Sequence, residues 1–215
     1  KNKNSKFLSD LDLGVLPLNK RTKARVQFMR AEMEYNMAIR IMQEHKPNYL
    51  LIDGSLMVGA EIDPIKTEEY QKYIHTFKKM LRMAQDSHIR VVGVSEDSTS
   101  RGLINYMEAK GLRKEVARGL SSLTDSSLIQ LYSQDKKPFE AIATKPFIPV
   151  SNKGREWIRK NIGIDLSFPT FYLQATELGR ALRVDFPSKG KNIGKEAREI
   201  ASLLTYLSQI PKRYG

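Results

Sequence analysis

One short stretch of the chain holds the residue types that could bind a metal ion. Asp53, Gly54 and Ser55 follow the uninterrupted apolar run 49–52. The run has the length of a buried strand, and Gly54 marks the point where such a strand must turn. Asp53 would then stand at the carboxyl end of the strand, where open α/β sheets place their ligand crevice. Its carboxylate could bind a divalent metal. An aspartate that caps its own backbone in a turn explains this residue equally well.

A second strand of the same kind follows. Residues 89–95 are apolar and largely β-branched, and they lead into Glu96 and Asp97. Between the two strands, residues 67–86 repeat apolar side chains at helical spacing. A strand, a helix and a strand in this order imply a parallel pair with a right-handed crossover. The carboxyl ends of both strands then lie on one rim of the sheet, and Asp53 shares that rim with the Glu96–Asp97 pair.

A long helix is predicted before the first strand, over residues 22–44. Its apolar stripe consists of Val26, Met29, Met33, Met37 and Ile41. At about 100° per residue, Glu34 borders this stripe and Glu32 points farther away from it. A carboxylate at the edge of a helix that packs on a sheet can join an aspartate on a nearby strand. Glu34 is therefore a candidate partner of Asp53, and the alternative is a surface glutamate that pairs with Arg30.

The rest of the chain adds elements that complete an α/β fold. Residues 101–110 are expected to be helical, 114–119 form a basic connector, and Asp125 caps a short helix. Residues 136–150 contain three prolines and are expected to be irregular. The later elements are a short basic helix at 152–161, two hairpin strands at 168–175 and 181–186, and a last helix at 193–207.

The charge of the chain points to an anionic partner. Lys and Arg number 36 against 24 Asp and Glu, which gives a net charge of +12. Nucleic acid is the usual partner of so basic a protein, and a generally basic surface is the alternative. The chain has no cysteine, which excludes disulfides and thiolate metal sites. No apolar run approaches the roughly 18 residues of a membrane span, and no signal-peptide pattern opens the chain. We expect a cytoplasmic protein without a membrane partner.

Several of these stretches, taken in order, resemble the NurA family of archaeal nucleases. The first is the aspartate motif 51–56, and the second is the strand 91–95 that runs into a serine-rich turn. The third is Leu123-Thr124-Asp125 with the residues that follow it. The fourth is the late hairpin, with Phe171-Tyr172-Leu173 and then Leu182-Arg183-Val184-Asp185-Phe186-Pro187. Their order and approximate spacing agree with the family over most of the chain.

The resemblance implies a fold and an activity. The expected fold is a ribonuclease-H-like mixed sheet flanked by helices, in a single domain over residues 1–215. The expected activity is a manganese- or magnesium-dependent deoxyribonuclease, which digests DNA from 5′ ends and cuts single strands during double-strand-break resection. The implied partners are DNA, a second copy of the chain in a homodimer, and a hexameric translocase of the HerA type.

The resemblance also assigns roles to individual residues. Asp53 and Glu34 correspond to metal ligands, with Glu32 as the fallback, and Tyr214 falls where the family has a catalytic tyrosine. The candidates for contacts with the DNA backbone are Lys153, Arg155, Lys189 and Lys191. The family also has an earlier Asp-Gly-Ser strand and a histidine after the tyrosine, neither of which is found here. The sequence is therefore expected to be incomplete at both ends.

The residues fit the chemistry that the resemblance implies. Carboxylates without cysteine favour Mg²⁺ or Mn²⁺ over zinc. Two such ions can stabilise the attacking and leaving oxygens of a phosphodiester. A non-catalytic DNA-binding or assembly protein is the main alternative. A phosphatase with Asp53 as its nucleophile is disfavoured because position 55 is serine, and an ATPase is disfavoured because no Gly-rich phosphate loop occurs.

Overall fold

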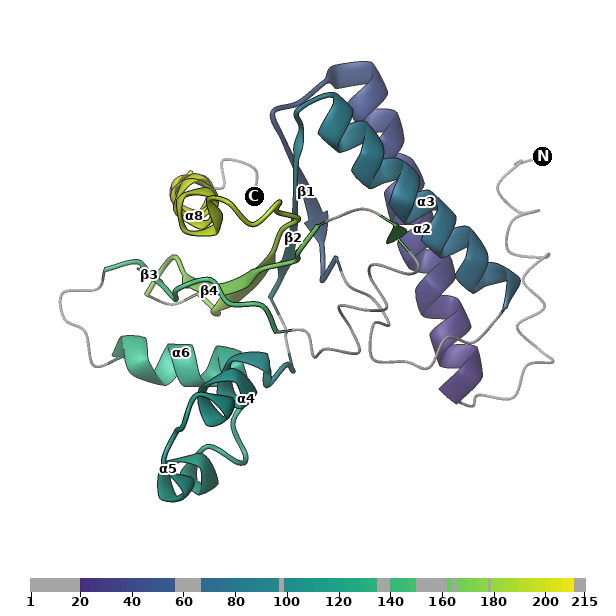
Figure 1. Ribbon diagram of the computed structural model, residues 1–215. Helices are drawn as coiled ribbons and strands as arrows, with labels where there is room; N and C mark the ends of the chain where they lie inside the picture. Colours follow the sequence, from purple (N-terminus) through teal and green to yellow (C-terminus); the bar gives the residue numbers. More distant parts are fainter. Residues whose placement is uncertain are drawn as a thin grey trace, which may run out of the picture.

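The computed structural model describes residues 20–56, 67–96, 99–134, 140–149, 162–163, 166–177 and 179–210 (Figure 1). These residues form a mixed sheet with helices on both of its faces. Within them, no helix combines the length and the apolar character needed to cross a membrane.

The sheet has five strands in the order β1-β2-β5-β4-β3. The strands are β1 (Tyr49–Asp53), β2 (Arg90–Ser95), β3 (Ile142–Ala143), β4 (Thr170–Gln174) and β5 (Leu182–Asp185). β1 and β2 pair in parallel, with Asp53 opposite Val94, and all other pairs are antiparallel. The predicted parallel unit is confirmed, and β1 lies at one edge of the sheet that the described strands form.

Helices α2 (Lys20–His45) and α3 (Glu68–Asp86) cover the β1–β2 half of one face. Thr67 caps α3, because its hydroxyl accepts a hydrogen bond from the backbone N–H of Tyr70 at 3.3 Å. The two helices are joined by a row of buried aromatic rings with centroids 5.0–6.1 Å apart: Phe28, Tyr73, Tyr35 and Phe77. Rings at this spacing add to the stability that their burial alone supplies.

The predicted apolar stripe of α2 is largely on the wrong side of the helix. Val26, Met33 and Met37 are more than half exposed. The buried side is a second stripe with the same helical spacing, made of Ala24, Phe28, Ala31, Tyr35, Ala38, Ile39 and Met42. Both stripes satisfy the i, i+3, i+4 rule. The second one carries the two aromatic rings that reach α3, and their large buried area favours this orientation.

Two matched methionine substitutions test this orientation. Met42→Ala is expected to lower the free energy of unfolding by about 2–5 kcal/mol, because Met42 is buried in the α2–α3 core. Met33→Ala is expected to change it by less than about 0.5 kcal/mol, because that side chain is exposed. Urea unfolding of both variants measures the difference. Equal losses would mean that α2 does not pack as described.

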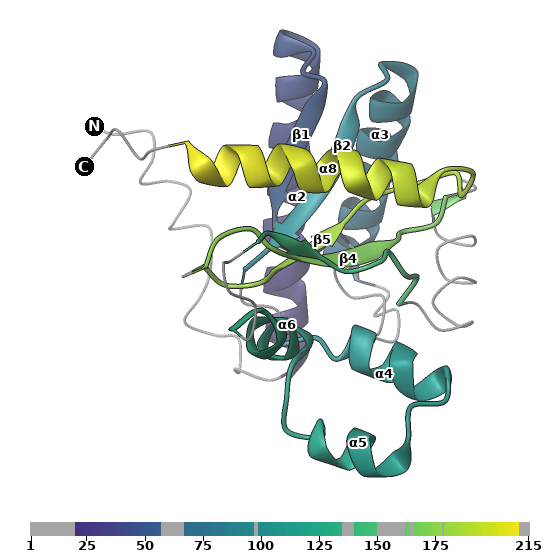
Figure 2. The same ribbon diagram turned by 90° about the vertical axis from the view of Figure 1, so that its left-hand side faces the viewer.

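In the described part of the chain, the long helix α8 (Ile193–Gln209) covers the opposite face. Figure 2 shows it lying across the strands. It contributes Ala197, Ile200 and Leu204 to a core with Val92, Phe171, Leu173 and Val184.

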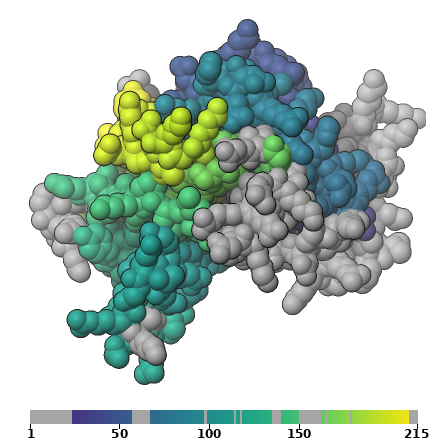
Figure 3. All heavy atoms as spheres, in the orientation of Figure 1, coloured from purple at the N-terminus to yellow at the C-terminus, as the bar shows by residue number. Residues whose placement is uncertain are grey.

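The β4–β5 half of the first face is covered by α4 (Gly102–Ala109) and α6 (Asp125–Gln134). Between them, α5 (Lys114–Gly119) replaces the predicted basic connector. Four of its six residues (Lys114, Glu115, Ala117 and Arg118) are good helix formers, a preference that their charge pattern concealed. Figure 3 shows the α4–α5 segment projecting from the body of the protein.

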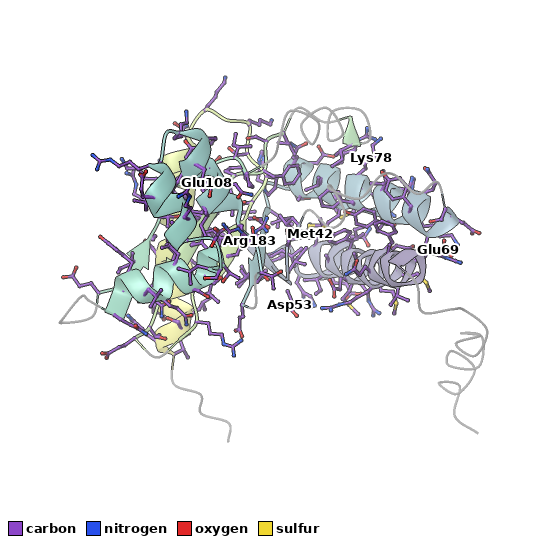
Figure 4. The ribbon with its side chains drawn as sticks, turned by 90° about the horizontal axis from the view of Figure 1, so that it is seen from below. Met42, Asp53, Glu69, Lys78, Glu108 and Arg183 are labelled. Atoms are coloured by element: carbon purple, nitrogen blue, oxygen red, sulfur yellow. The ribbon has the colours of Figure 1, made fainter. Side chains whose placement is uncertain are left out.

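Two groups of helices therefore share one face of the sheet, α2 with α3 and α4 with α6. We call the line between them the seam. Val184 belongs to the core under α8, so the neighbouring positions of β5, Arg183 and Asp185, turn toward the seam. Figure 4, seen from below, shows Arg183 between the two groups and Asp53 near it at the edge of the sheet.

Candidate active site

Asp53 is the last residue of β1 and lies at the rim formed by the carboxyl ends of β1 and β2. Gly54 follows it with a φ of 101°, a conformation that glycine adopts without strain. The backbone N–H of Gly54 donates to the carbonyl of Val94 at 2.6 Å, so the parallel pairing continues into the turn. The Asp53 side chain is 88% exposed, and its carboxylate is open to a ligand.

The turn after Asp53 is fixed from three sides. The Ser55 hydroxyl donates to Oδ2 of Asp185 at 2.7 Å, and the Tyr35 hydroxyl donates to the carbonyl of Leu56 at 3.1 Å. Gly93 lies directly beneath the turn, and a Cβ there would stand 2.7 Å from the carbonyl oxygen of Gly54. The turn that carries Asp53 is therefore held against β2 and β5.

Asp185 is a buried carboxylate at the centre of these contacts. Only 2% of it is exposed, and it accepts hydrogen bonds from Ser55, from the Thr170 hydroxyl at 2.5 Å and from Nε of Arg183 at 3.1 Å. Burial pulls the pKa of the Arg183 guanidinium down, the charge of Asp185 pushes it up, and the net direction is upward. The Arg183 guanidinium is therefore charged, and it forms a buried ion pair with Asp185.

Glu34 reaches the same region from α2. Nε of Arg30 donates to Oε1 of Glu34 at 2.8 Å, and the other side of the same guanidinium lies 3.7 Å from Oδ2 of Asp53. The charge of Glu34 also acts on Tyr35: burial raises the pKa of that phenol first, and the charges of Glu34 and Asp185 raise it further. Glu32, in contrast, accepts a hydrogen bond from Asn36 at 3.5 Å. Of the two glutamates, Glu34 is the one that contacts the same guanidinium as Asp53, that of Arg30.

These residues suit a hard divalent cation that keeps part of its water shell. Within the described ranges, no group of three or more histidine, aspartate or glutamate side chains is placed to hold a metal. The Glu34–Asp53 pair supplies two carboxylates, and the Arg30 guanidinium already lies between them. Mg²⁺ is commonly held by one or two carboxylates together with phosphate oxygens of the substrate. The donor set therefore fits such an ion, with Arg30 as its competitor.

Two of the basic residues proposed from the sequence lie away from this rim. Lys189 and Lys191 are exposed in the turn before α8, beyond the end of β5 that points away from Asp53. Tyr214, Lys153 and Arg155 lie outside the described residues. Arg183 and Asp185 are the rim residues that the sequence argument did not select as site residues. Their alternation on a hairpin strand, a cation and an acid on one face, was the available signal.

Asp125, the acid in the motif that begins at Leu123, has a structural role. Asp125 is fully buried and accepts from the backbone N–H groups of Leu103 and Ile104 at 2.9 and 3.0 Å, and from the Tyr172 hydroxyl at 2.7 Å. It therefore caps the start of α4 from a distance in sequence. The cap of its own helix comes from Thr124, whose hydroxyl accepts from the N–H of Ser127 at 3.2 Å.

Comparisons with known proteins agree with this architecture. A family model described as the NurA domain matches residues 2–215. The crystal structure of the NurA nuclease from Sulfolobus solfataricus superposes with a TM-score of 0.50 at 14% sequence identity. The alignment covers 93% of this chain and 72% of that chain. The curated protein sequences give no significant match. The predicted mixed sheet flanked by helices is thereby confirmed as the fold.

Proposed function

Because the chain belongs to the NurA family, we propose that it is a metal-dependent deoxyribonuclease whose active site is the rim at Asp53. The observation that carries this proposal is the Glu34–Arg30–Asp53 arrangement. Glu34 of α2 and Asp53 of β1 both contact the Arg30 guanidinium, at the carboxyl ends of the parallel strands β1 and β2. Surface ion pairs contribute little to stability, so stability alone does not account for three charges gathered at this position.

The proposed roles follow from the chemistry of the groups. A divalent ion, when bound, would stabilise the negative charge that builds up on the phosphate and lower the pKa of an attacking water. Glu34 and Asp53 would hold this ion, and Mn²⁺ or Mg²⁺ suits such oxygen ligands. Arg30 would leave the carboxylates and turn toward the anionic substrate. Tyr214 would orient the phosphate, and Lys153, Arg155, Lys189 and Lys191 would contact the backbone of the DNA elsewhere.

The finer parts of the proposal concern products and partners. We propose 5′-to-3′ exonuclease and single-strand endonuclease activity in the processing of double-strand breaks, with a hexameric translocase of the HerA type as partner. We also propose a homodimer. The exposed apolar side of α2, with Val26, Met33 and Met37, supports an assembly that covers it, as does the position of β1 at an edge of the described sheet.

A non-catalytic DNA-binding protein is the second candidate. It is favoured by one observation, which is that the described residues bring no third acid or histidine to the Glu34–Asp53 pair. This protein would bind DNA with or without a divalent metal and would leave it intact.

One digestion experiment separates the two candidates. We expect the protein to degrade 5′-labelled single-stranded DNA in Mn²⁺ and to stop when the metal is chelated. Asp53→Ala is expected to lower the rate at least about 100-fold, because it removes a ligand that acts on the transition state. Asp86→Ala is the matched control, since Asp86 is an exposed acid on α3. Equal cleavage by wild type and Asp53→Ala would remove Asp53 from the mechanism.

A further inference from the structure

We propose that Arg183 binds a backbone phosphate of the DNA strand at the rim, and that Asp185 positions it for this contact. The inference rests on the proposed nuclease function, since it supplies the substrate contact that the carboxylates of that site cannot make. Arg183 was not among the basic residues expected to contact DNA.

The position of Arg183 is set by the register of the sheet. Arg183 lies opposite Ser95, the last residue of β2, and Asp53 is aligned through Val94 with Val184. Two strand spacings separate β1 from β5, which places the backbones at Asp53 and Arg183 about 10 Å apart. A DNA strand that presents one phosphate at Asp53 would thus present a neighbouring phosphate near Arg183.

Among the described residues, one hydrogen bond holds the guanidinium, and the nearby Asp125 carboxylate also favours its charged form. Its Nε donates to Asp185, and these residues provide no other hydrogen bond to it. The Arg183 side chain keeps 17% of its surface exposed, against 2% for Asp185. The fork of terminal nitrogens is therefore the part left for a ligand, and a guanidinium fork matches the geometry of phosphate oxygens.

Asp185 links this arginine to the turn that carries Asp53. The same carboxylate accepts from Ser55, two residues after Asp53, and from Thr170 on the far strand. An arginine with its Nε fixed to a buried carboxylate loses few rotamers when it binds, so the contact is preorganised. Because α2–α3 and α4–α6 flank the seam, the cation acts in a region of reduced solvent screening.

DNA binding in the absence of metal tests the proposal. Arg183→Met is expected to weaken the binding of a labelled single-stranded oligonucleotide about 10- to 100-fold in chelator, the loss of one charge-assisted contact. The slope of log affinity against log salt should fall by about 0.7, the value for one phosphate of a single strand. In Mn²⁺, the loss should appear mainly in KM rather than in kcat. Arg183→Lys, which keeps the charge, should recover part of the affinity.

A second variant controls for misfolding, because Arg183→Met leaves the buried Asp185 carboxylate without the cation that pairs with it. Arg183→Met combined with Asp185→Asn removes both charges and should show the same loss of affinity and salt slope. Arg198→Met, an exposed arginine of α8 on the opposite face, is the matched control and should change the affinity less than threefold.

The result that overturns the proposal is a folded double variant with wild-type affinity and salt slope. This outcome is independent of cleavage. If the wild type fails to cleave DNA in any divalent metal, the nuclease proposal is wrong. The metal-free binding data still decide the role of Arg183. If the wild type cleaves DNA and the double variant matches it in both DNA affinity and KM, only the role proposed for Arg183 is wrong.

Discussion

Replacing Gly93 by alanine is expected to destabilise the protein by about 1–3 kcal/mol and to slow DNA cleavage at least about tenfold. The added Cβ would stand 2.7 Å from the carbonyl oxygen of Gly54, 2.8 Å from Cγ of Leu56 and 3.0 Å from its backbone N. Two of these atoms belong to the backbone of the turn after Asp53, and they cannot rotate away. The turn would have to lift from β2, and Asp53 would move with it. Urea unfolding and the rate of Mn²⁺-dependent cleavage per folded molecule measure the two effects.

Gly119→Ala is the control for this substitution. Gly119 ends α5, has no atom within 4 Å of a built Cβ and lies away from the rim. Alanine at such a position is expected to leave stability unchanged or to raise it by about 0.4–1 kcal/mol, with cleavage at the wild-type rate. If Gly93→Ala cleaved DNA as fast as the wild type, the fixed position of the Asp53 turn would not matter for catalysis.

Replacing Asp125 by alanine is expected to cost about 3–5 kcal/mol of the free energy of unfolding. The substitution leaves two N–H groups at the start of α4 and the Tyr172 hydroxyl without their acceptor in a fully buried place. Each unsatisfied buried donor costs about 1–3 kcal/mol. Burial already raises the pKa of Tyr172, a hydrogen bond from Ser100 lowers it, and the Asp125 carboxylate raises it again, so the phenol stays protonated and continues to donate.

Asp125→Asn and Tyr172→Phe resolve the contributions to this loss. Asparagine keeps one acceptor oxygen and should recover part of the stability, whereas Tyr172→Phe should cost only about 1 kcal/mol. A double-mutant cycle between the two positions in urea unfolding gives their coupling. A loss below 1 kcal/mol for Asp125→Ala would contradict the capping role.

The sequence predicted most of the elements because most of them carry one dominant local signal. The apolar runs before Asp53 and Glu96 predicted strands, and the helical repeat between them indicated a parallel pair. The first run is an edge strand rather than a fully buried one, because Leu51 is 42% exposed. The orientation of α2 was mispredicted because that helix carries two stripes of equal spacing. Local periodicity cannot rank two such stripes. Which stripe is buried depends on Tyr73 and Phe77 of α3, because their rings pack against only one of the two stripes.

Within the candidate site, the sequence determined the chemistry, and the tertiary structure decided the partners. An apolar strand that ends in Asp53-Gly54-Ser55 predicted a carboxylate at a turn, and the local pattern left open whether this carboxylate binds a metal or caps its own backbone. Which charges meet that carboxylate is set by side-chain contacts between elements far apart in the chain. Ser55 and Asp185 are separated by 130 positions, and Asp53 meets Glu34 only through Arg30. Such contacts follow from the packing of α2 against the sheet and from the pairing of β5 with β2, and no local pattern encodes either.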